Sequence, residues 1–436
     1  MNSGITISNR KVSFGGISLT EFIEKYETPL FLFSEQRLED NYKALEESFR
    51  RYYPKTEVFF SVKTNFELSI LKTLRRLGSK AEAASALEVI IAKKAGFEGS
   101  EMVLDGPAWT DNDIKFCIQK NISTFNVDSI DELRRVNRLA KAIGKKVKIS
   151  FRIFPEIRMS ILKSFIEGYI SKFGIPLSQA VELYKEALTM NHVIPCAIST
   201  HIGSMITDPR YYEKTVQRLV KLAADLRDEL GINIEAINIG GGFGVQSLNY
   251  YSIQNVILNK AGISQYSKAA SIEEFGKRIG QKFAKELKEN KLSEIKLIVE
   301  PGRFLVSDSG ILITRVVAVK DKWIFIDGGI NLIPESIFFI RRGFLIANKI
   351  GQEAKYEYNI AGPTLNTADV LAVNQKLPKM EVGDLVIVLD SGAYSLTRSN
   401  QFTILRPDAL YITKDKKIKY LRKKEQPDDI LNKLIP

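Results

Sequence analysis

The chain has 436 residues, 44% of them hydrophobic, and a formal net charge of +12 at pH 7, which allows a large core divided over two or three domains. Its two cysteines and two histidines exclude a disulfide framework, a thiolate metal cluster and a metal site with several histidine ligands, so we expect no metal. No apolar run approaches the roughly 20 residues that cross a membrane, and no signal peptide or nucleic-acid-binding module is recognisable, so we expect a soluble, cytoplasmic protein without a membrane or nucleic-acid partner.

Short apolar segments alternate with helical patterns through most of the chain. Each apolar segment is a strand candidate, and the first five begin one strand-plus-helix unit apart. The candidates are Val58–Val62, Lys80–Ala84, Met102–Asp105, Thr124–Val127, Val147–Ile153, Ala197–His201, Ala236–Ile239 and Lys296–Glu300. These alternating units predict a (β/α)8, TIM-like barrel over residues 30–302, with an open doubly wound sheet as the alternative.

The segments between these strands have the period of amphipathic helices. In SIDELRRVNRLAKAIG, Ser129 and Glu132 form a capping-box pattern, apolar residues recur on one face, and Gly144 follows as a C-terminal cap. YYEKTVQRLVKLAADLRDELG has the same period and ends at Gly231. Both patterns predict helices that pack against the strands of the barrel.

The pattern changes after Arg303. Runs such as GILITRVVAVKDKWIFIDGG and DLVIVLDSGAY alternate with turns and contain no long helix. We therefore expect a second, all-β domain that resembles a sandwich or barrel and is made of residues 303–436 together with the strand-like residues 1–29.

A lysine, Lys63, ends the first strand candidate. The commonest explanation is a surface lysine at a strand end, because a desolvated amine is costly unless it is paired, exposed or covalently used. Other reactive residue types also follow strands, namely Asp105, His201, residues 240–244 and Glu300. Active sites of such barrels lie at the C-terminal ends of the strands, so we expect these residues on one rim.

Each residue type on this rim has a chemical role open to it. Successive glycines at 240–242 expose backbone N–H groups that suit a phosphate, although tight turns need glycine too. Lys63 near a phosphate could form a Schiff base with a pyridoxal aldehyde, and Glu300 could keep a pyridine nitrogen protonated. His201 is by default a hydrogen-bonded structural residue, and here could stack on such a ring.

The motifs SVKTN, HIGS, INIGGGFG, EPGR, GPTLNTAD and SGAY occur in this order. Together with SKFG at residues 171–174, they resemble the motifs of the pyridoxal-phosphate-dependent decarboxylases of the alanine-racemase-like fold (fold type III). That group includes diaminopimelate, ornithine and arginine decarboxylases, and the resemblance is greatest to the diaminopimelate decarboxylase branch. The resemblance extends over residues 28–412 and implies pyridoxal 5'-phosphate as the cofactor.

The resemblance implies a role for each matching residue. It implies that Lys63 forms the Schiff base, that His201 stacks on the cofactor ring, and that Glu300 pairs with the pyridine nitrogen. The other cofactor-binding residues that it implies are Ser204, Gly240, Gly241, Gly242, Gly302, Arg303 and Tyr394. In this family the GP-containing segment and the SGAY segment enter the active site from the partner subunit, so the resemblance also implies a homodimer with shared active sites.

Two substrate-binding motifs of the family are altered. Leu365 replaces the cysteine that is the family's expected proton donor, and Asn366 replaces a carboxylate that contacts the distal amino group of the substrate. The run PESIF at residues 334–338 lacks the arginine and tyrosine that bind the far carboxylate in diaminopimelate decarboxylases. The candidates for the substrate site are Arg303, Arg341, Arg342, Leu365, Asn366 and Tyr394.

These changes predict a carboxy-lyase that removes the α-carboxylate of an unusual or conjugated amino acid through an aldimine on Lys63 and a quinonoid intermediate. Examples are a natural-product or siderophore precursor and an aminoacyl group on an acidic carrier protein, which the +12 charge would attract. The alternatives are an ordinary diaminopimelate decarboxylase, a decarboxylation-dependent transaminase, a racemase or epimerase, and a catalytically silent homologue that regulates a protein partner.

Overall fold

The computed structural model describes residues 4–157, 172–250, 268–337 and 340–435. Its contacts divide the chain into two compact units. The barrel unit comprises Tyr42–Val245 and Ala269–Gly302, and the β unit comprises Met1–Asn41, Gln246–Lys268 and Arg303–Pro436. Each unit is described by itself.

The barrel unit is built on a closed parallel sheet, as the sequence predicts. The strands pair in sequence order from β5 to β9 and then through β11, β12 and β14, which pairs with β5 and closes the barrel. They are β5 (Thr56–Ser61), β6 (Lys80–Ala83), β7 (Met102–Asp105), β8 (Thr124–Val127), β9 (Val147–Phe154), β11 (Val193–Ser199), β12 (Ala236–Asn238) and β14 (Lys296–Val299), with the short β10 (Ile175–Pro176) beside β9. The open doubly wound sheet is therefore excluded.

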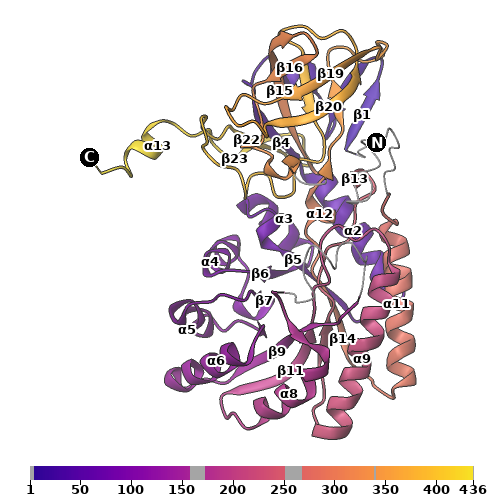
Figure 1. The fold of residues 1–436 in the computed structure, drawn as a ribbon, viewed down its shortest axis with the longest axis vertical. Coiled ribbons are helices and arrows are strands. Elements are labelled where there is room, and N and C mark those ends of the chain that lie inside the picture. The colour runs from indigo at the N-terminus through magenta and orange to yellow at the C-terminus, as the bar shows by residue number, and fades with distance from the viewer. Residues whose placement is uncertain (1–3, 158–171, 251–267, 338–339, 436) are drawn as a thin grey trace. The chain divides into compact units, whose positions relative to one another are not determined.

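Helices follow the strands and lie outside the sheet, as α3 to α6 do in Figure 1. In α6 the side chain of Ser129 accepts a hydrogen bond from the backbone of Glu132, and Gly144 ends the helix with φ of +73°. The helical elements described in this unit are α3 (Leu68–Arg76), α4 (Ala86–Ala95), α5 (Asp111–Gln119), α6 (Ile130–Ile143), α8 (Ala180–Leu188), α9 (Arg210–Leu230), α11 (Ile272–Glu289), η1 (Val62–Thr64), η2 (Gly99–Glu101) and η3 (Leu177–Gln179). Helix α2 (Glu35–Arg50) spans the junction of the two units.

The β unit contains a three-stranded sheet, β1–β2–β3, and a larger sheet in the order β20–β19–β16–β15–β4–β22–β23, with β21 pairing with β15 and β18. The strands are β1 (Ile5–Ser8), β2 (Lys11–Phe14), β3 (Ile17–Ser18), β4 (Leu30–Ser34), β13 (Asn249–Tyr250), β15 (Gly310–Lys320), β16 (Trp323–Ile326), β17 (Ile340–Arg341), β18 (Phe344–Ile346), β19 (Tyr356–Ala361), β20 (Val370–Leu377), β21 (Leu385–Val388), β22 (Ala409–Ile412) and β23 (Ile418–Arg422). Its helical turns are α1 (Leu19–Ile23), α12 (Arg303–Val306), η4 (Pro334–Ile337) and α13 (Asp428–Leu431).

Residues 30–41 and the described residues 246–250 and 268, which the sequence analysis assigned to the barrel, group with the β unit. Strand β4 explains the first difference, because LFLFS pairs with β15 on one side and β22 on the other and is buried along its whole length. A continuous apolar run is typical of any strand covered on both faces, so the sequence did not distinguish a central strand of the β unit from a barrel strand.

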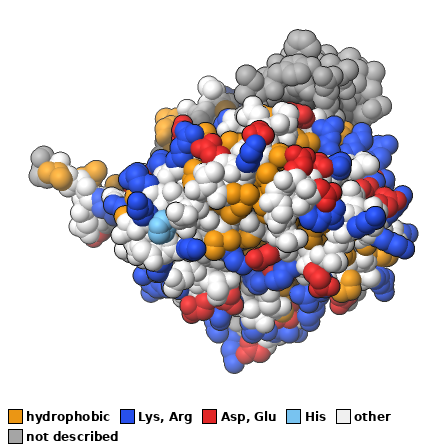
Figure 2. All heavy atoms as spheres, turned by 90° about the horizontal axis from the view of Figure 1, so that it is seen from below, with side chains coloured by type: hydrophobic (Ala, Val, Ile, Leu, Met, Phe, Trp, Pro, Cys, Tyr) orange, Lys and Arg blue, Asp and Glu red, His pale blue; other side chains and the backbone are white. Residues whose placement is uncertain are grey.

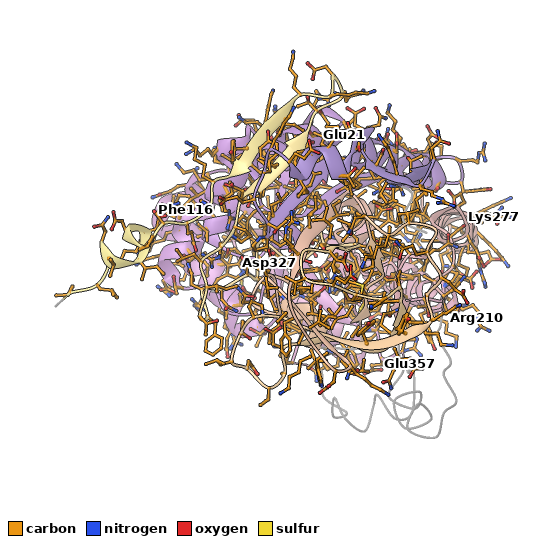
Figure 3. All side chains as sticks on the ribbon, turned by 90° about the horizontal axis from the view of Figure 1, so that it is seen from above. Glu21, Phe116, Arg210, Lys277, Asp327 and Glu357 are labelled. Carbon is orange, nitrogen blue, oxygen red and sulfur yellow. The ribbon has the colours of Figure 1, made fainter. Side chains whose placement is uncertain are left out.

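The apolar core of the β unit includes Phe14, Leu32, Ile313, Ile387 and Leu410. Burial of each such side chain contributes about 1.5–3 kcal/mol to folding. Asp327, labelled in Figure 3, follows β16 and accepts hydrogen bonds from the Thr28 hydroxyl (2.6 Å) and the Arg315 backbone (2.9 Å), which fixes the start of the following Gly-Gly-Ile-Asn segment.

Candidate active site

Alternation along the barrel strands brings polar side chains to one end of the barrel interior. One buried cluster contains residues from strands that are not all neighbours, namely Phe59, Val103, Ala197, Ala236 and Ile298. Side chains of such strands can meet only inside the barrel, so this cluster fills the barrel interior. Successive side chains of a strand point to opposite faces of the sheet, so the residue two positions later shares the same face. The residues that follow this cluster toward the C-terminal ends are Ser61, Asp105, Asn238 and Glu300.

Lys63 lies in η1, directly after β5, and is paired with a buried carboxylate. Its Nζ donates hydrogen bonds to both carboxylate oxygens of Glu82, at 2.9 and 2.8 Å. The Glu82 side chain is fully buried, whereas that of Lys63 is 39% exposed. Ser61 pairs with Glu82 in the register of β5 and β6. This pairing places Lys63, two residues after Ser61, close to the Glu82 side chain. An amine that is charged, positioned and still accessible is therefore available at this rim.

Glu300 is a buried carboxyl at the end of β14. Asn238 donates a hydrogen bond from Nδ2 to its Oε1 at 2.6 Å. Burial raises the pKa of Glu300 to about 8, and the negative charges of Glu82 and Asp105 act in the same direction. Glu300 therefore holds a proton at neutral pH and can share it with a basic nitrogen placed against it.

His201 follows β11 and is held as a neutral imidazole. The backbone N–H of Gly241 donates to its Nδ1 at 3.2 Å, which leaves the ring proton on Nε2. Burial, together with the positive charges of Lys63 and Arg152, lowers the pKa of His201 to about 3. The residue thus provides a flat, uncharged ring on the same rim as Lys63.

The glycines after β12 let three backbone segments approach closely. A Cβ atom on Gly241 would lie 1.9 Å from the Glu300 carbonyl oxygen, and one on Gly242 would lie 1.9 Å from the Gly203 carbonyl oxygen. Gly240 and Gly242 also have φ of +71° and +88°, a region that favours glycine. The Tyr212 hydroxyl donates to the Gly241 carbonyl oxygen at 2.6 Å and fixes the turn.

Gly302 and Ser204 complete the predicted residues of the barrel unit. A Cβ atom on Gly302 would lie 2.1 Å from the Thr64 Oγ1, so Gly302 lets the chain pass next to η1. Ser204 is exposed beside the turn that follows His201. Contacts thus connect Lys63, His201, the glycines and Glu300 at one end of the barrel.

Sequence reasoning left several rim residues out of the site. Glu82 and Asn238 are not among the site residues that the sequence analysis predicts. Arg152 donates to Asp105 at 2.8 Å within the same interior, and burial raises the pKa of Asp105. The signal that could have found them is the alternation of inward and outward side chains along each strand. It identifies the inward residues only once the register of the strands is known.

The β unit has its own group of predicted residues. Arg303 donates from Nη1 and Nη2 to the two oxygens of Glu335 at 2.7 and 2.8 Å, and its guanidinium lies 4.9 Å from the centre of the Tyr394 ring. Arg342 is buried nearby, and its Nη2 lies 3.5 Å from the Glu335 carboxylate. Arg341 is part of β17, and its side chain lies outside the part of the chain that the structure describes.

The loop with the altered GP motif is organised by Asp369. Its carboxylate accepts hydrogen bonds from the Ile330 backbone (2.9 Å) and from the backbone (2.9 Å) and hydroxyl (2.6 Å) of Thr364. Leu365 is 93% exposed, and the Asn366 side chain accepts from the Ala368 backbone at 2.9 Å. The PESIF run is described only as far as residue 337, so Phe338 lies outside the described residues, as does Ser171 of the SKFG run.

Charges of both signs are mixed on the face of the molecule that Figure 2 shows. On the face in Figure 2, Lys and Arg side chains are mixed with Asp and Glu side chains and with apolar ones, so no single sign of charge covers that face. In the described ranges, no three His, Cys, Asp or Glu side chains converge as metal ligands. None of the helices described is both long and apolar enough to cross a membrane.

Residues 37–307 match the family model of the pyridoxal-dependent decarboxylases, pyridoxal binding domain. Diaminopimelate decarboxylase of Archaeoglobus fulgidus is 31% identical over 96% of this chain and 95% of its own length, and that of Methanocaldococcus jannaschii is 30% identical over 100% and 97%. The crystal structure of the M. jannaschii diaminopimelate decarboxylase with L-lysine has a TM-score of 0.88 at 28% identity and covers 100% of this chain and 98% of that one.

The rim of the barrel fits the cofactor that this family model names. It offers an accessible amine at Lys63, a buried carboxyl with a raised pKa at Glu300, a neutral aromatic ring at His201, and a turn that favours glycine at Gly240–Gly242. A phosphate, an aldehyde and a pyridine nitrogen need groups of these kinds. The chain therefore belongs to the pyridoxal-dependent decarboxylase family and is a carboxy-lyase that uses pyridoxal 5'-phosphate.

Proposed function

We propose that the chain is a diaminopimelate decarboxylase, which releases one carboxylate of diaminopimelate as carbon dioxide, replaces it by a proton and yields lysine. The observation that carries the proposal is the similarity to named diaminopimelate decarboxylases along the whole chain, in both units. The prediction of an unusual or carrier-bound substrate has no support among these relatives, and the ordinary alternative fits them better.

When bound, the pyridoxal ring accepts the electron pair that is released as the bond between Cα and the carboxylate breaks. We propose that the amine of Lys63 binds the aldehyde carbon of the cofactor. We assign to Glu300 the proton at the ring nitrogen, since this carboxyl is buried, its pKa is raised to about 8, and Asn238 orients it. His201, Ser204, Gly240, Gly241, Gly242 and Gly302 are the proposed cofactor contacts of the barrel unit.

The proton that replaces the carboxylate needs a donor other than residue 365, because a leucine side chain has no acidic hydrogen. We propose Lys63 as that donor, because its Nζ carries hydrogens and donates hydrogen bonds to the two Glu82 oxygens, with N–O distances of 2.9 and 2.8 Å. Glu82 then acts on the reaction through Lys63, by fixing its position. This assignment yields an amine as the product.

A second candidate is a decarboxylase for a different amino acid, or one whose product is a carbonyl compound. The specific observation that favours it is the loop at 364–366, where the exposed Leu365 and the neutral Asn366 replace two groups that the family uses. A racemase is disfavoured, because racemases of this fold usually place an arginine at the ring nitrogen where this chain has Glu300.

One panel of substrates distinguishes the two candidate functions. Purified holoenzyme is incubated with meso-diaminopimelate, L-lysine, L-ornithine and L-arginine, and carbon dioxide and products are measured by mass spectrometry. We expect carbon dioxide and lysine in equal amounts from meso-diaminopimelate. Turnover of another amino acid but not of meso-diaminopimelate supports the second candidate, and a carbonyl product would contradict Lys63 as the donor.

We also propose a homodimer in which Tyr394 and the 362–369 loop serve the partner's active site. The resemblance to the family supports it, because the GP-containing segment and the SGAY segment of that family enter the active site from the partner subunit.

A further inference from the structure

A cavity of about 320 Å³, lined mainly by polar residues, lies within the β unit, and none of the proposed cofactor or substrate residues is among those that line it. Its walls come from the turn between β2 and β3, from the end of β4 with the first turns of α2, and from the turn between β22 and β23. The lining residues include Gly16, Gln36, Arg37, Asp40, Lys414 and Lys416. Sites for small molecules have volumes of about 300–1,000 Å³, so this cavity has room for a small ligand.

Two of the four charged side chains that line the cavity already pair with carboxylates. Arg37 donates from Nε and Nη2 to Asp308 at 2.9 and 2.7 Å. Lys414 donates from Nζ to Glu39 at 2.8 Å. The charges of these two cations are therefore balanced within the protein.

The other two charged side chains, Asp40 and Lys416, have no partner of opposite sign in the part of the chain that the structure describes. The Asp40 carboxylate accepts a hydrogen bond from the neutral amide of Gln36 at 2.8 Å. The ammonium group of Lys416 makes no hydrogen bond or ion pair with any described residue. Among the described residues, the cavity thus has one negative and one positive charge that do not pair with each other or with a neighbour.

The backbone holds these two charges on separate elements. The Lys416 backbone N–H donates to the Thr413 carbonyl oxygen at 2.8 Å, within the turn between β22 and β23. A Cβ atom on Gly16 would lie 3.4 Å from Lys416 Cε and 3.7 Å from its Nζ, so the lysine side chain lies next to the turn between β2 and β3. Asp40 belongs to α2, one helical turn after Gln36. The two charges therefore line one cavity from different elements, with room for a ligand in it.

Fixed charges of opposite sign are complementary to a ligand that carries both signs. A ligand with a single charge neutralises only one of the two side chains, whereas a zwitterion neutralises both. We propose that this cavity binds a small zwitterion of the α-amino acid type, with the ligand's carboxylate at Lys416 and its ammonium group at Asp40. Both side chains are exposed, and exposed ion pairs are weak, so the affinity expected is in the millimolar range. The inference does not depend on which amino acid the enzyme decarboxylates.

The test uses the holoenzyme and a zwitterion that cannot react with the cofactor. N,N-dimethylglycine is a tertiary amine and forms no Schiff base with an aldehyde, and its binding is followed by ligand-observed NMR titration. Isovalerate has the same shape and carboxylate but no ammonium group, and 2-(dimethylamino)ethanol has the ammonium group but no carboxylate. We expect N,N-dimethylglycine to bind at millimolar concentrations, and each comparison compound to bind about three- to tenfold more weakly.

Variants of the two side chains connect this binding to the cavity. Lys416→Gln and Asp40→Asn each remove one charge and nearly keep the size of an exposed side chain, so both should fold and should weaken binding of N,N-dimethylglycine about three- to tenfold. Lys416→Gln should also abolish the preference over 2-(dimethylamino)ethanol, and Asp40→Asn the preference over isovalerate. Lys417→Gln is the matched control, because Lys417 belongs to the same turn, pairs with Asp415 at 2.6 Å and does not line the cavity, so its loss should leave the affinity unchanged.

Three results would overturn the inference. One is an affinity for N,N-dimethylglycine that is the same in Lys416→Gln and Asp40→Asn as in the wild type. Another is equal affinity of the wild type for isovalerate and N,N-dimethylglycine, because the ammonium group would then contribute nothing. The third is the absence of binding up to about 10 mM.

Discussion

Lys63 is two residues beyond the end of β5, in a tight 3-10 turn, and its amine is held by the fully buried carboxylate of Glu82. The sequence predicted the lysine at a strand end but not its partner, because Glu82 belongs to the next strand and the pairing depends on the register of Ser61 with Glu82. The end of a strand can be predicted from one segment of sequence, whereas a contact between two strands depends on both segments and on their register.

The attachment of the cofactor to Lys63 is directly testable. Borohydride reduction of the holoenzyme followed by peptide mass spectrometry should give a pyridoxyl-phosphate adduct on the peptide that contains Lys63, and Lys63→Ala should abolish it. Lys80, which pairs with Glu57 at 2.8 Å in the same barrel, serves as the matched lysine, and Lys80→Ala should keep the adduct. An adduct on another lysine, or none, would remove Lys63 from its proposed role.

Glu300 should matter for rate more than for binding. Glu300→Gln keeps the shape and the contact with Asn238 but cannot hold a proton for the ring nitrogen, so we expect kcat to fall about a hundredfold, as for the loss of one electrostatic stabiliser. Glu132→Gln is the control, because this buried carboxyl caps α6 through the Asp128 backbone (2.8 Å) and has no proposed catalytic part. Equal kcat values in wild type and Glu300→Gln would refute the assignment.

The same residue predicts a pH dependence of stability in the cofactor-free protein. The pKa of Glu300 is raised from 4.5 to about 8, so between these pH values the folded state holds a proton that the unfolded state has released. Raising the pH through this window therefore lowers the free energy of unfolding, by up to about 1.4 kcal/mol per pH unit, and the stabilisation is complete only below pH 4.5. Denaturant unfolding from pH 5 to pH 9 should show a smaller slope in Glu300→Gln, and equal slopes would contradict the raised pKa.

At the scale of elements, the strands and helices of the barrel were predictable to within a few residues, because their apolar periods and caps are local. The β unit was less predictable. Strand β4 was assigned to the barrel, and the contact between Arg303 and Glu335 was missed, since it joins α12 to η4 across 32 residues with no local signal. The features that the sequence predicted depend on residues close together in the chain. The features that it missed depend on contacts between residues far apart in the chain, and not on weak secondary-structure propensity.

The turn after β12 gives a prediction at this scale. Gly241→Ala would place a methyl group 1.9 Å from the Glu300 carbonyl oxygen, so β12 and β14 would have to separate locally. We expect lower stability, by about 1–3 kcal/mol, together with loss of bound cofactor. Ser129→Ala, which removes the N-cap of α6, should cost about 1 kcal/mol and leave the cofactor content unchanged. Equal effects of both variants on cofactor content would mean that the glycine turn has no binding role.

At the scale of the whole molecule, the proposed shared active site predicts complementation between inactive variants. Lys63→Ala and Tyr394→Ala each damage a different part of the site. If the two residues act in different subunits, mixing the variants gives about half heterodimers, each with one intact site, and about a quarter of the wild-type activity. If they act within one chain, mixing restores nothing, and size-exclusion chromatography of each variant confirms that both still assemble.

Each unit is assembled from distant parts of the chain, and this has a consequence for synthesis. Strand β4 pairs with β22, and β5 pairs with β14 to close the barrel. At about 5–20 residues per second, the ribosome needs on the order of tens of seconds between making β4 and making β22. During that time β4 exposes an apolar strand without its partners, so the nascent chain carries an aggregation-prone edge, and we expect its yield in the cell to depend on chaperones more than that of proteins with local contacts.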